Sequence, residues 1–357
     1  MGRALLVGLL LVWGAGCLVV MDDETPGRGA PGEVVGDCVV PVPAGVEALG
    51  PPVSLELAEG SLWVFGETQL TAPGAAGATV IPNAAALVRS VDDGCAGRLE
   101  LLRDADGVPA PFAALLPEEE ADNAARTDGK RVDVTPRGGF AWQGRGYLYY
   151  DKLLRGPGMF DAEWLGTGLC VTAGAGAPCV RQDRLLWEGA DAPWGGAGLL
   201  GDDGLVYLVA CFHAAAFVDL CGVARVAPAS AADPGAYRFY NVFNNWVEDP
   251  RNYTVAFDGP GSVTPGRSAF LDRYTVVYAN IWESTVELRV APEPWGSWGD
   301  ARVLFDAVAP DSWFIGGGVE HAALRSADGA TLAITYHVVS ATGPSGLHLV
   351  SYRLRGD

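Results

Sequence analysis

A strand pattern that occurs five times constrains the fold of this chain more than any other feature of its sequence. The clearest copy is GSLWVFGET at residues 60–68, where apolar side chains alternate between the two faces of an extended strand and Glu67 stands near the end. Weaker copies, rich in Tyr, Leu and Val, begin at residues 144, 204, 272 and 329. Five such units predict a repeat protein.

Each copy is surrounded by further short strand patterns, with turn residues between them and no long segment of helical periodicity. Four units have four predicted strands each, and the fifth has three. The 48 glycines and 24 prolines suit many tight turns. The sequence therefore predicts an all-β, five-bladed β-propeller with very little helix; a two-sheet sandwich is the competing interpretation.

The second unit is predicted to contain strands at 139–142 and 147–152. The first strands of the fourth and fifth units are expected at 267–271 and 318–325. A strand at residues 38–42 is expected to complete the fifth unit, since a propeller ring closes when one terminus supplies the missing strand of the terminal blade.

Six cysteines follow Cys17, and an even number in an exported chain indicates disulfides. Two pairs flank predicted hairpin turns, which leaves one pair to fix the N-terminal strand to the first unit. The predicted disulfides are Cys170–Cys179, Cys211–Cys221 and Cys38–Cys95. No C-x-x-C pair or histidine cluster indicates zinc, so the sequence predicts no metal site and no cofactor, with a bound calcium ion left open.

The N-terminus resembles a bacterial lipoprotein export signal. In residues 1–17, Arg3 supplies the charge, an apolar core follows, and small residues lead to Cys17, the residue that such signals lipidate. An ordinary cleaved signal is the alternative. Residues 18–37 are predicted to be a flexible tether, and residues 38–357 the propeller domain. By resemblance to lipoprotein sorting in enteric bacteria, we expect lipid anchoring in the bacterial cell envelope, at the outer membrane.

The charge of the chain excludes one class of partner. A net charge of −19 argues against nucleic acid, because binding a phosphate backbone needs clustered Lys and Arg. We expect a monomer that contacts the membrane only through its N-terminal lipid.

Three stretches resemble an uncharacterised family of bacterial secreted propeller domains. LWVFGET at residues 62–68 looks like that family's LWVFGDT strand, and ELRVAPEPWGSW at 287–298 resembles its strand and Pro-Trp-Gly-Pro-Trp turn. CGVARV at 221–226 resembles its third blade. The family is similar in architecture to five-bladed glycosidase propellers of the arabinanase and xylosidase type, which implies a polysaccharide or other glycan as ligand.

Two residues depart from the family's pattern. Glu67 replaces the usual Asp, and Arg267 stands where a carboxylate would align. Two interpretations therefore stay open. One is a surface-anchored, glycoside hydrolase-like propeller that acts on polysaccharide, and the other is a non-catalytic propeller that binds glycans or proteins.

Glycoside hydrolysis needs two carboxylates that face each other across a sugar. Glu67 and Asp151 end the repeated strand in the first and second units, which makes them the leading pair. Asp133, Glu283 and Glu320 are further candidates on loops or strand ends. Each also has a structural interpretation, as a solvated strand end or as the partner of an arginine or of backbone N–H groups.

Four residues are candidates for binding the ligand. Arg267 could bind an anionic sugar through two N–H donors of its guanidinium group, or it could form an ion pair within a blade. Trp282 and Trp313, flanked by small and polar residues, could stack on sugar rings or pack between blades. His321 follows a glycine-rich approach to a strand, which suits a ligand-facing residue and equally a hydrogen-bonded core histidine.

Overall fold

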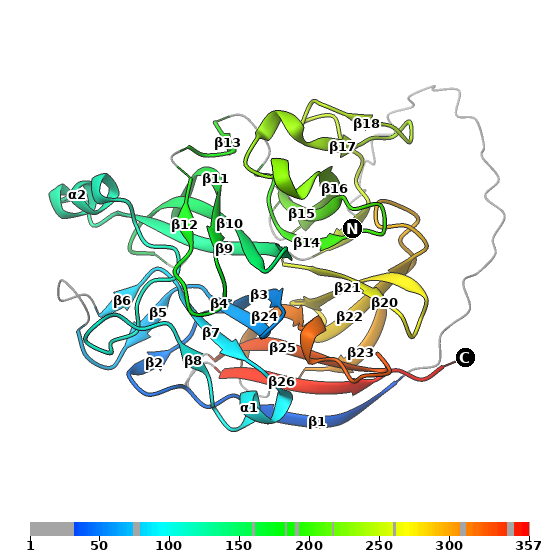
Figure 1. The fold of residues 1–357 in the computed structure, drawn as a ribbon, viewed down its shortest axis with the longest axis horizontal. Helices are drawn as coiled ribbons and strands as arrows, with labels where there is room; N and C mark the ends of the chain where they lie inside the picture. Colours follow the sequence, from blue (N-terminus) through cyan, green and yellow to red (C-terminus); the bar gives the residue numbers. More distant parts are fainter. Residues whose placement is uncertain are drawn as a thin grey trace, which may run out of the picture.

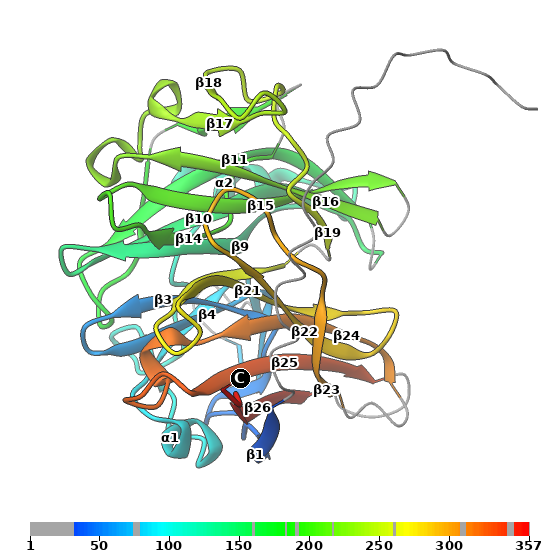
Figure 2. The same ribbon diagram turned by 90° about the vertical axis from the view of Figure 1, so that its right-hand side faces the viewer.

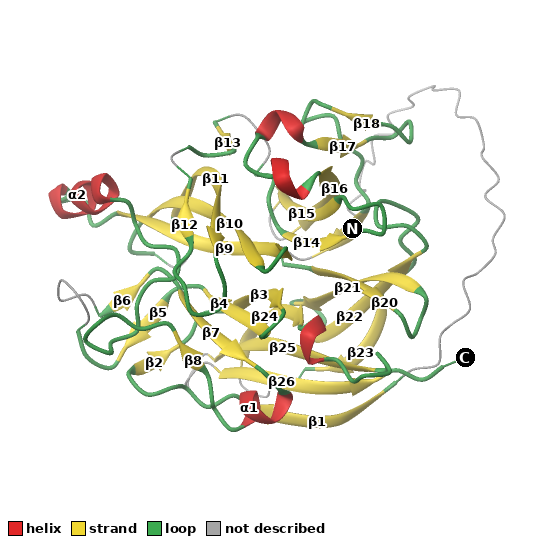
Figure 3. Ribbon diagram, viewed as in Figure 1, coloured by secondary structure: helices red, strands yellow, loops and turns green. Residues whose placement is uncertain are grey.

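The computed structural model describes residues 32–73, 79–158, 161–182, 184–189, 193–215, 218–259, 262–307, 312–340 and 346–356. The predicted signal with Cys17 and most of the tether lie outside these residues. The described chain is all-β with few helices, as predicted (Figure 3). In these ranges, none of the helices is both long and apolar enough to span a membrane.

Five sheets of four or more strands follow one another around the molecule (Figure 1). The first sheet contains β3 (Pro52–Leu57), β4 (Gly60–Phe65), β7 (Ala84–Val88) and β8 (Glu100–Leu101). The second contains β9 (Arg131–Trp142), β10 (Arg145–Arg155), β11 (Ala162–Thr172), β12 (Val180–Arg181) and β13 (Trp187–Glu188). The third contains β14 (Ala197–Leu200), β15 (Val206–Ala215), β16 (Val218–Val226), β17 (Arg238–Tyr240), β18 (Trp246–Val247) and β19 (Phe257–Gly259).

The remaining sheets complete the set. The fourth contains β20 (Thr264–Ser268), β21 (Arg273–Asn280), β22 (Thr285–Ala291) and β23 (Arg302–Asp306). The fifth contains β24 (Ser312–Glu320), β25 (Thr331–Ser340), β26 (Gly346–Arg353) and β1 (Glu33–Val39). A small sheet of β2 (Val46–Ala48), β5 (Thr68–Leu70) and β6 (Val80–Ile81) accompanies them.

The repeated sequence pattern forms the second strand of each sheet, and its alternation explains how the sheets pack. In β4, Trp63 and Phe65 are buried in a cluster with Leu347 and Leu349 of the fifth sheet. Leu62 and Val64 alternate with these two residues. Their side chains face the other way and pack in a cluster with residues of the second sheet. A strand that is apolar on both faces can therefore hold its sheet between two neighbours.

The first strands of the five sheets contact one another in cyclic order. Strand β3 contacts β9, β9 contacts β14, β14 contacts β20, β20 contacts β24, and β24 contacts β3. Each of five hydrophobic clusters joins one sheet to the next. This arrangement does not fit a two-sheet sandwich, in which two sheets pack face to face over one core.

The N-terminal strand pairs with the C-terminal one. Strand β1 lies antiparallel to β26, with Cys38 opposite Leu349, and the two strands are adjacent in Figure 2. Cys38 is bonded to Cys95 at the end of α1 (Val91–Cys95), which follows the first sheet's strand β7. The three predicted disulfides are all confirmed, the other two being Cys170–Cys179 and Cys211–Cys221.

The first strands of the fourth and fifth sheets begin earlier in the sequence than predicted. Strand β20 starts at Thr264 and β24 at Ser312, whereas the sequence pattern predicted starts at 267 and 318. Glycines in both strands allow a close approach to neighbouring atoms. A Cβ on Gly266 would lie 2.8 Å from Nη2 of Arg325, and a Cβ on Gly318 would lie 2.2 Å from the backbone N of Ala279.

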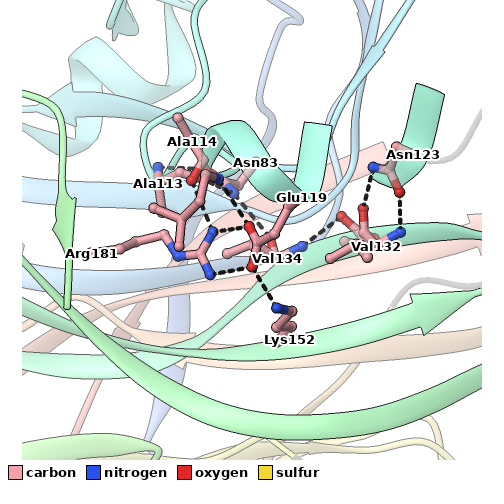
Figure 4. Close-up of polar contacts among 11 residues, drawn as sticks. Asn83, Ala113, Ala114, Glu119, Asn123, Val132, Val134, Lys152 and Arg181 are labelled. Atoms are coloured by element: carbon pink, nitrogen blue, oxygen red, sulfur yellow. Dashed lines mark hydrogen bonds and ion pairs between the residues drawn. The ribbon is translucent and has the colours of Figure 1, made fainter. Parts of the chain in front are cut away.

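The segment between β8 and β9 contains a helix, α2 (Pro117–Ala125), whose first turn is acidic. Glu119 is buried and accepts hydrogen bonds from Arg181, with Lys152 Nζ 2.8 Å from its Oε1 (Figure 4). Burial raises the pKa of the Glu119 carboxyl, but the hydrogen bonds from Arg181 and Lys152 outweigh it and lower the pKa to about 2. These contacts fix helix α2 to the second sheet.

Candidate functional site

A cleft opens at the end of the sheets where their first strands begin. It consists of two cavities of about 650 and 400 Å³ that share Thr135, Pro136 and Ser262 as lining residues. The larger cavity lies between the first and second sheets, and the smaller lies between the second and third. Both volumes are in the range of small-molecule sites. We call the two cavities together the cleft.

Glu67 lines the larger cavity from the bend between β4 and β5. Its carboxylate forms an ion pair with Arg131, and its Oε2 lies 4.0 Å from Nε of Arg155. The Glu67 side chain is 37% exposed and that of Arg131 is 45% exposed, so both are accessible from solvent. Glu67 is thus held at its position without being sealed from the cavity.

Arg131 and Arg155 come from neighbouring strands of the second sheet. The register of β9 and β10 places them directly opposite each other, at the ends of both strands. Arg155 Nε donates to Oδ2 of Asp133 at 2.7 Å, and its Nη2 donates to Thr135 Oγ1 at 3.3 Å. The Asp133 side chain is only 2% exposed, so this candidate carboxylate anchors Arg155 and does not reach the cavity.

Asp151 lines the smaller cavity and accepts three hydrogen bonds. Its Oδ1 accepts from Trp164 Nε1 at 3.1 Å and from Thr167 Oγ1 at 2.8 Å, and its Oδ2 accepts from Arg137 Nη1 at 3.0 Å. Arg137 also donates to the carbonyl of Cys211 in the third sheet, at 3.1 Å. Asp151 therefore orients Arg137 and Trp164 along the cavity wall.

Glu67 and Asp151, the leading pair from the sequence, thus belong to different sheets and line different parts of one cleft. Both carboxylates face an arginine. The cleft offers charged donors and hydroxyl groups together with the indole of Trp164, a combination that can hold a polar ligand with an apolar face.

Glu283 and Trp282 lie in the exposed turn between β21 and β22. Since Thr264 pairs with Val277, this turn is at the same end of the fourth sheet as Ser262. Neither residue lines the two cavities of the cleft. The side chain of Trp313 lies outside the described part of the chain, so its predicted role stays a prediction.

The structure places Glu320 and His321 in the core, away from the cleft. Glu320 is buried and paired with Arg325 beside a cavity of about 60 Å³, which is too small for a sugar. Glu56 lines the same cavity, and burial raises the pKa of its carboxyl. The ring of His321 is fully buried and stacks on Trp63.

Hydrogen bonds account for both nitrogens of His321. Nδ1 lies 3.3 Å from Ser61 Oγ and Nε2 lies 2.8 Å from Thr335 Oγ1. Burial lowers the pKa of His321 to about 3. These contacts fit the hydrogen-bonded core histidine that the sequence left open.

Arg267 lies at the opposite end of the fourth sheet from the cleft. Its Nη2 donates to Oδ1 of Asp272 at 2.6 Å, in the turn that joins β20 and β21. This is the ion pair within a blade that the sequence offered as the alternative to sugar binding.

Three arginines of the cleft were not predicted from the sequence: Arg131, Arg137 and Arg155. The pattern predicted strands at 139–142 and 147–152, whereas β9 and β10 run to Arg131 and Arg155. The parts of β9 and β10 that lie beyond the predicted strands pair in a register that places Arg131 opposite Arg155. Among the described residues, no group of three or more His, Cys, Asp or Glu side chains could hold a metal ion.

No family model and no curated protein sequence matches the chain. Among solved structures, it is similar to a protein from Bacteroides ovatus provisionally assigned as a hydrolase, with 14% identity, a TM-score of 0.59 and 86% of each chain covered. It is similar to a GH43_1 enzyme from Xanthomonas citri, with 13% identity, a TM-score of 0.51, and 91% of this chain and 90% of that chain covered.

A third similar structure is an alpha-L-arabinofuranosidase from Podospora anserina in complex with cellotriose, with 9% identity and a TM-score of 0.50, covering 90% of this chain and 96% of that chain. At such low identity these similarities concern the fold alone. The chain is an all-β protein whose structural neighbours are glycoside hydrolase β-propellers.

Proposed function

We propose that this chain is a carbohydrate-associated, five-bladed β-propeller of the glycoside hydrolase type, and that it binds a glycan in the cleft. One observation carries the proposal: two cavities of ligand size meet where the first strands begin, and Glu67 and Asp151 line them from neighbouring sheets. The similarity to glycoside hydrolase propellers supports the same ligand class.

The finer architecture belongs to this proposal. The cyclic contacts of five sheets support five blades, and the pairing of β1 with β26 supports closure of the ring by the N-terminal strand. In this interpretation residues 38–357 form one domain, and the resemblance of the LWVFGET strand supports membership of the LWVFGDT family.

In a hydrolytic reaction, Glu67 would be the carboxylate that contacts the sugar, because it is the more accessible of the leading pair. Asp151 would hold Arg137 and Trp164 in position. A hydrolase also needs a second carboxylate that faces the first across the sugar, and Asp151 is instead held by Arg137, Trp164 and Thr167.

A specific observation therefore supports a second candidate, glycan binding without turnover. Both carboxylates of the leading pair have an arginine partner: Glu67 pairs with Arg131, and Asp151 pairs with Arg137.

One experiment separates the two candidates. Purified domain would be screened on a glycan array and then assayed for release of reducing sugar from the glycans it binds. Hydrolysis that Glu67→Gln reduces by about 10²-fold or more, with binding retained, supports the enzyme. Binding without sugar release supports the second candidate. Glu248→Gln is a matched control, since Glu248 forms an exposed ion pair with Arg238 in the third sheet.

We also propose that Cys17 is lipidated and anchors the protein in the bacterial cell envelope, at the outer membrane. The support is the signal pattern of residues 1–17. Incorporation of radiolabelled palmitate, followed by membrane fractionation, tests it. A Cys17→Ser variant should lose both the label and the membrane association, and an unlabelled wild-type protein would contradict the proposal.

A further inference from the structure

We propose that the larger cavity of the cleft recognises a carboxylate-bearing sugar, a uronic acid residue of the glycan, through Arg131 and Arg155. Glu67 serves there as an internal counter-ion. This inference rests on the proposed function, because it names the class of sugar that the cleft selects.

The first argument is the opposition of two like charges. Arg131 and Arg155 form a cross-strand pair at the ends of β9 and β10, an arrangement that destabilises a sheet unless an anion lies nearby. The protein supplies one exposed carboxylate, from the neighbouring sheet. Oε2 of Glu67 contacts Nη2 of Arg131 and lies 4.0 Å from Nε of Arg155. A carboxylate thus already occupies the place between the two guanidinium groups.

The second argument is the charge of the cavity. Its lining contains Arg131 and Arg155 against the single carboxylate of Glu67. The whole chain has 43 acidic and 24 basic residues, yet two arginines and one carboxylate line this cavity, because Asp133, which balances Arg155, is buried behind it. A ligand in the cavity therefore contacts more cationic than anionic side chains, which favours a ligand that is locally anionic.

The third argument is the capacity of the two arginines. A guanidinium group has five N–H donors in a planar fork that matches a carboxylate. Among the described residues, Arg131 uses Nη2 on Glu67, and Arg155 uses Nε and Nη2 on Asp133 and Thr135. Nη1 of both arginines makes no hydrogen bond to the described chain. A sugar carboxylate can bind there while Asp133 keeps Arg155 in place.

The test compares uronate-containing oligosaccharides with the same oligosaccharides after their carboxyl groups have been reduced to alcohols, by isothermal titration calorimetry. Wild-type protein should bind the uronate form about ten- to a hundred-fold more tightly, since hydrogen bonds to charged groups are the stronger ones. Arg131→Met should remove that preference. Arg89→Met, which breaks an exposed ion pair with Glu100 in the first sheet, should keep it.

Two further variants separate recognition from folding. Arg155→Lys keeps a positive charge beside the buried Asp133 but loses the fork, and it should weaken the preference. Glu67→Gln removes the competing internal carboxylate, and it should increase the preference for the uronate form over the reduced form several-fold.

The outcomes distinguish the two proposals. Equal binding of both forms by the wild type overturns the uronate subsite and leaves the glycan cleft standing. Binding of neither form, with no other glycan retained on an array, overturns both. Tighter binding of sulfated than of carboxylated sugars overturns the uronate assignment, and loss of preference in Arg89→Met shows unspecific charge attraction and overturns it as well.

Discussion

Arg131 and Arg155 lie directly opposite each other across β9 and β10, and the Glu67 carboxylate of the neighbouring sheet interacts with both. The contact joins the first and second sheets at the wall of the cleft. The residue that the sequence singled out is therefore part of a three-residue arrangement whose other two members come from one hairpin. The stability of this three-residue arrangement and its interaction with a ligand depend on the same three charges.

Glu67→Gln should destabilise the fold by a small, salt-dependent amount. Removing the counter-ion leaves two opposed arginines, but the exposed position limits the cost to about 0.5–1 kcal/mol. Urea unfolding at low and at high salt measures it. The difference from wild type should shrink in about 1 M salt, where charges are screened; a difference that does not change with salt would contradict the ion-pair account.

Glu119→Gln should be far more destabilising, because it leaves Arg181 charged and buried. The loss should be about 3 kcal/mol at neutral pH. The folded-state pKa of Glu119 is lowered to about 2, so its contribution is present above the unfolded pKa near 4.5 and is lost as pH falls toward 2. Wild type and variant should therefore converge in this window. Glu120→Gln, an exposed neighbour on α2, is the control and should behave like wild type.

The fold was largely predictable from the sequence, for a physical reason. The alternation in residues 60–68 reflects burial on both faces of β4, and the cysteine spacings reflect strand neighbours. The starts of β20 and β24 were not predictable, since Gly266 and Gly318 serve close packing by residues that are distant in sequence. The cleft was predictable only through Glu67 and Asp151. Its arginines depend on the register of β9 and β10.

Gly318→Ala should destabilise the contact between the fourth and fifth sheets. Its Cβ would lie 2.2 Å from the backbone N of Ala279 and 2.3 Å from the carbonyl carbon of Tyr278, and backbone atoms cannot move aside cheaply. We expect a loss of about 1–3 kcal/mol in chemical unfolding. Gly316→Ala is the matched control two residues away, where a Cβ meets nothing within 4 Å. Similar losses for both variants would show that strand flexibility, not close approach, is the cause.

His321→Gln should flatten the dependence of stability on pH between about 6 and 4. Burial lowers the folded-state pKa of His321 from 6.5 to about 3, so only the unfolded chain takes up this proton in that window. Stability should fall on acidification by up to about 1.4 kcal/mol per pH unit from this residue alone. Unfolding free energies measured at several pH values give the slopes. Identical slopes in wild type and variant would mean that His321 titrates in the folded protein.

The most direct test of the central claim is to fill the cleft. Ser262 is exposed and lines both cavities, so Ser262→Trp should block them without disturbing the core. Binding of wild type and variant to a glycan array is the measurement, with circular dichroism to verify the fold. The account predicts glycan binding by the wild type and its loss in the folded variant. Undiminished binding by Ser262→Trp, or no glycan bound by the wild type, would contradict it.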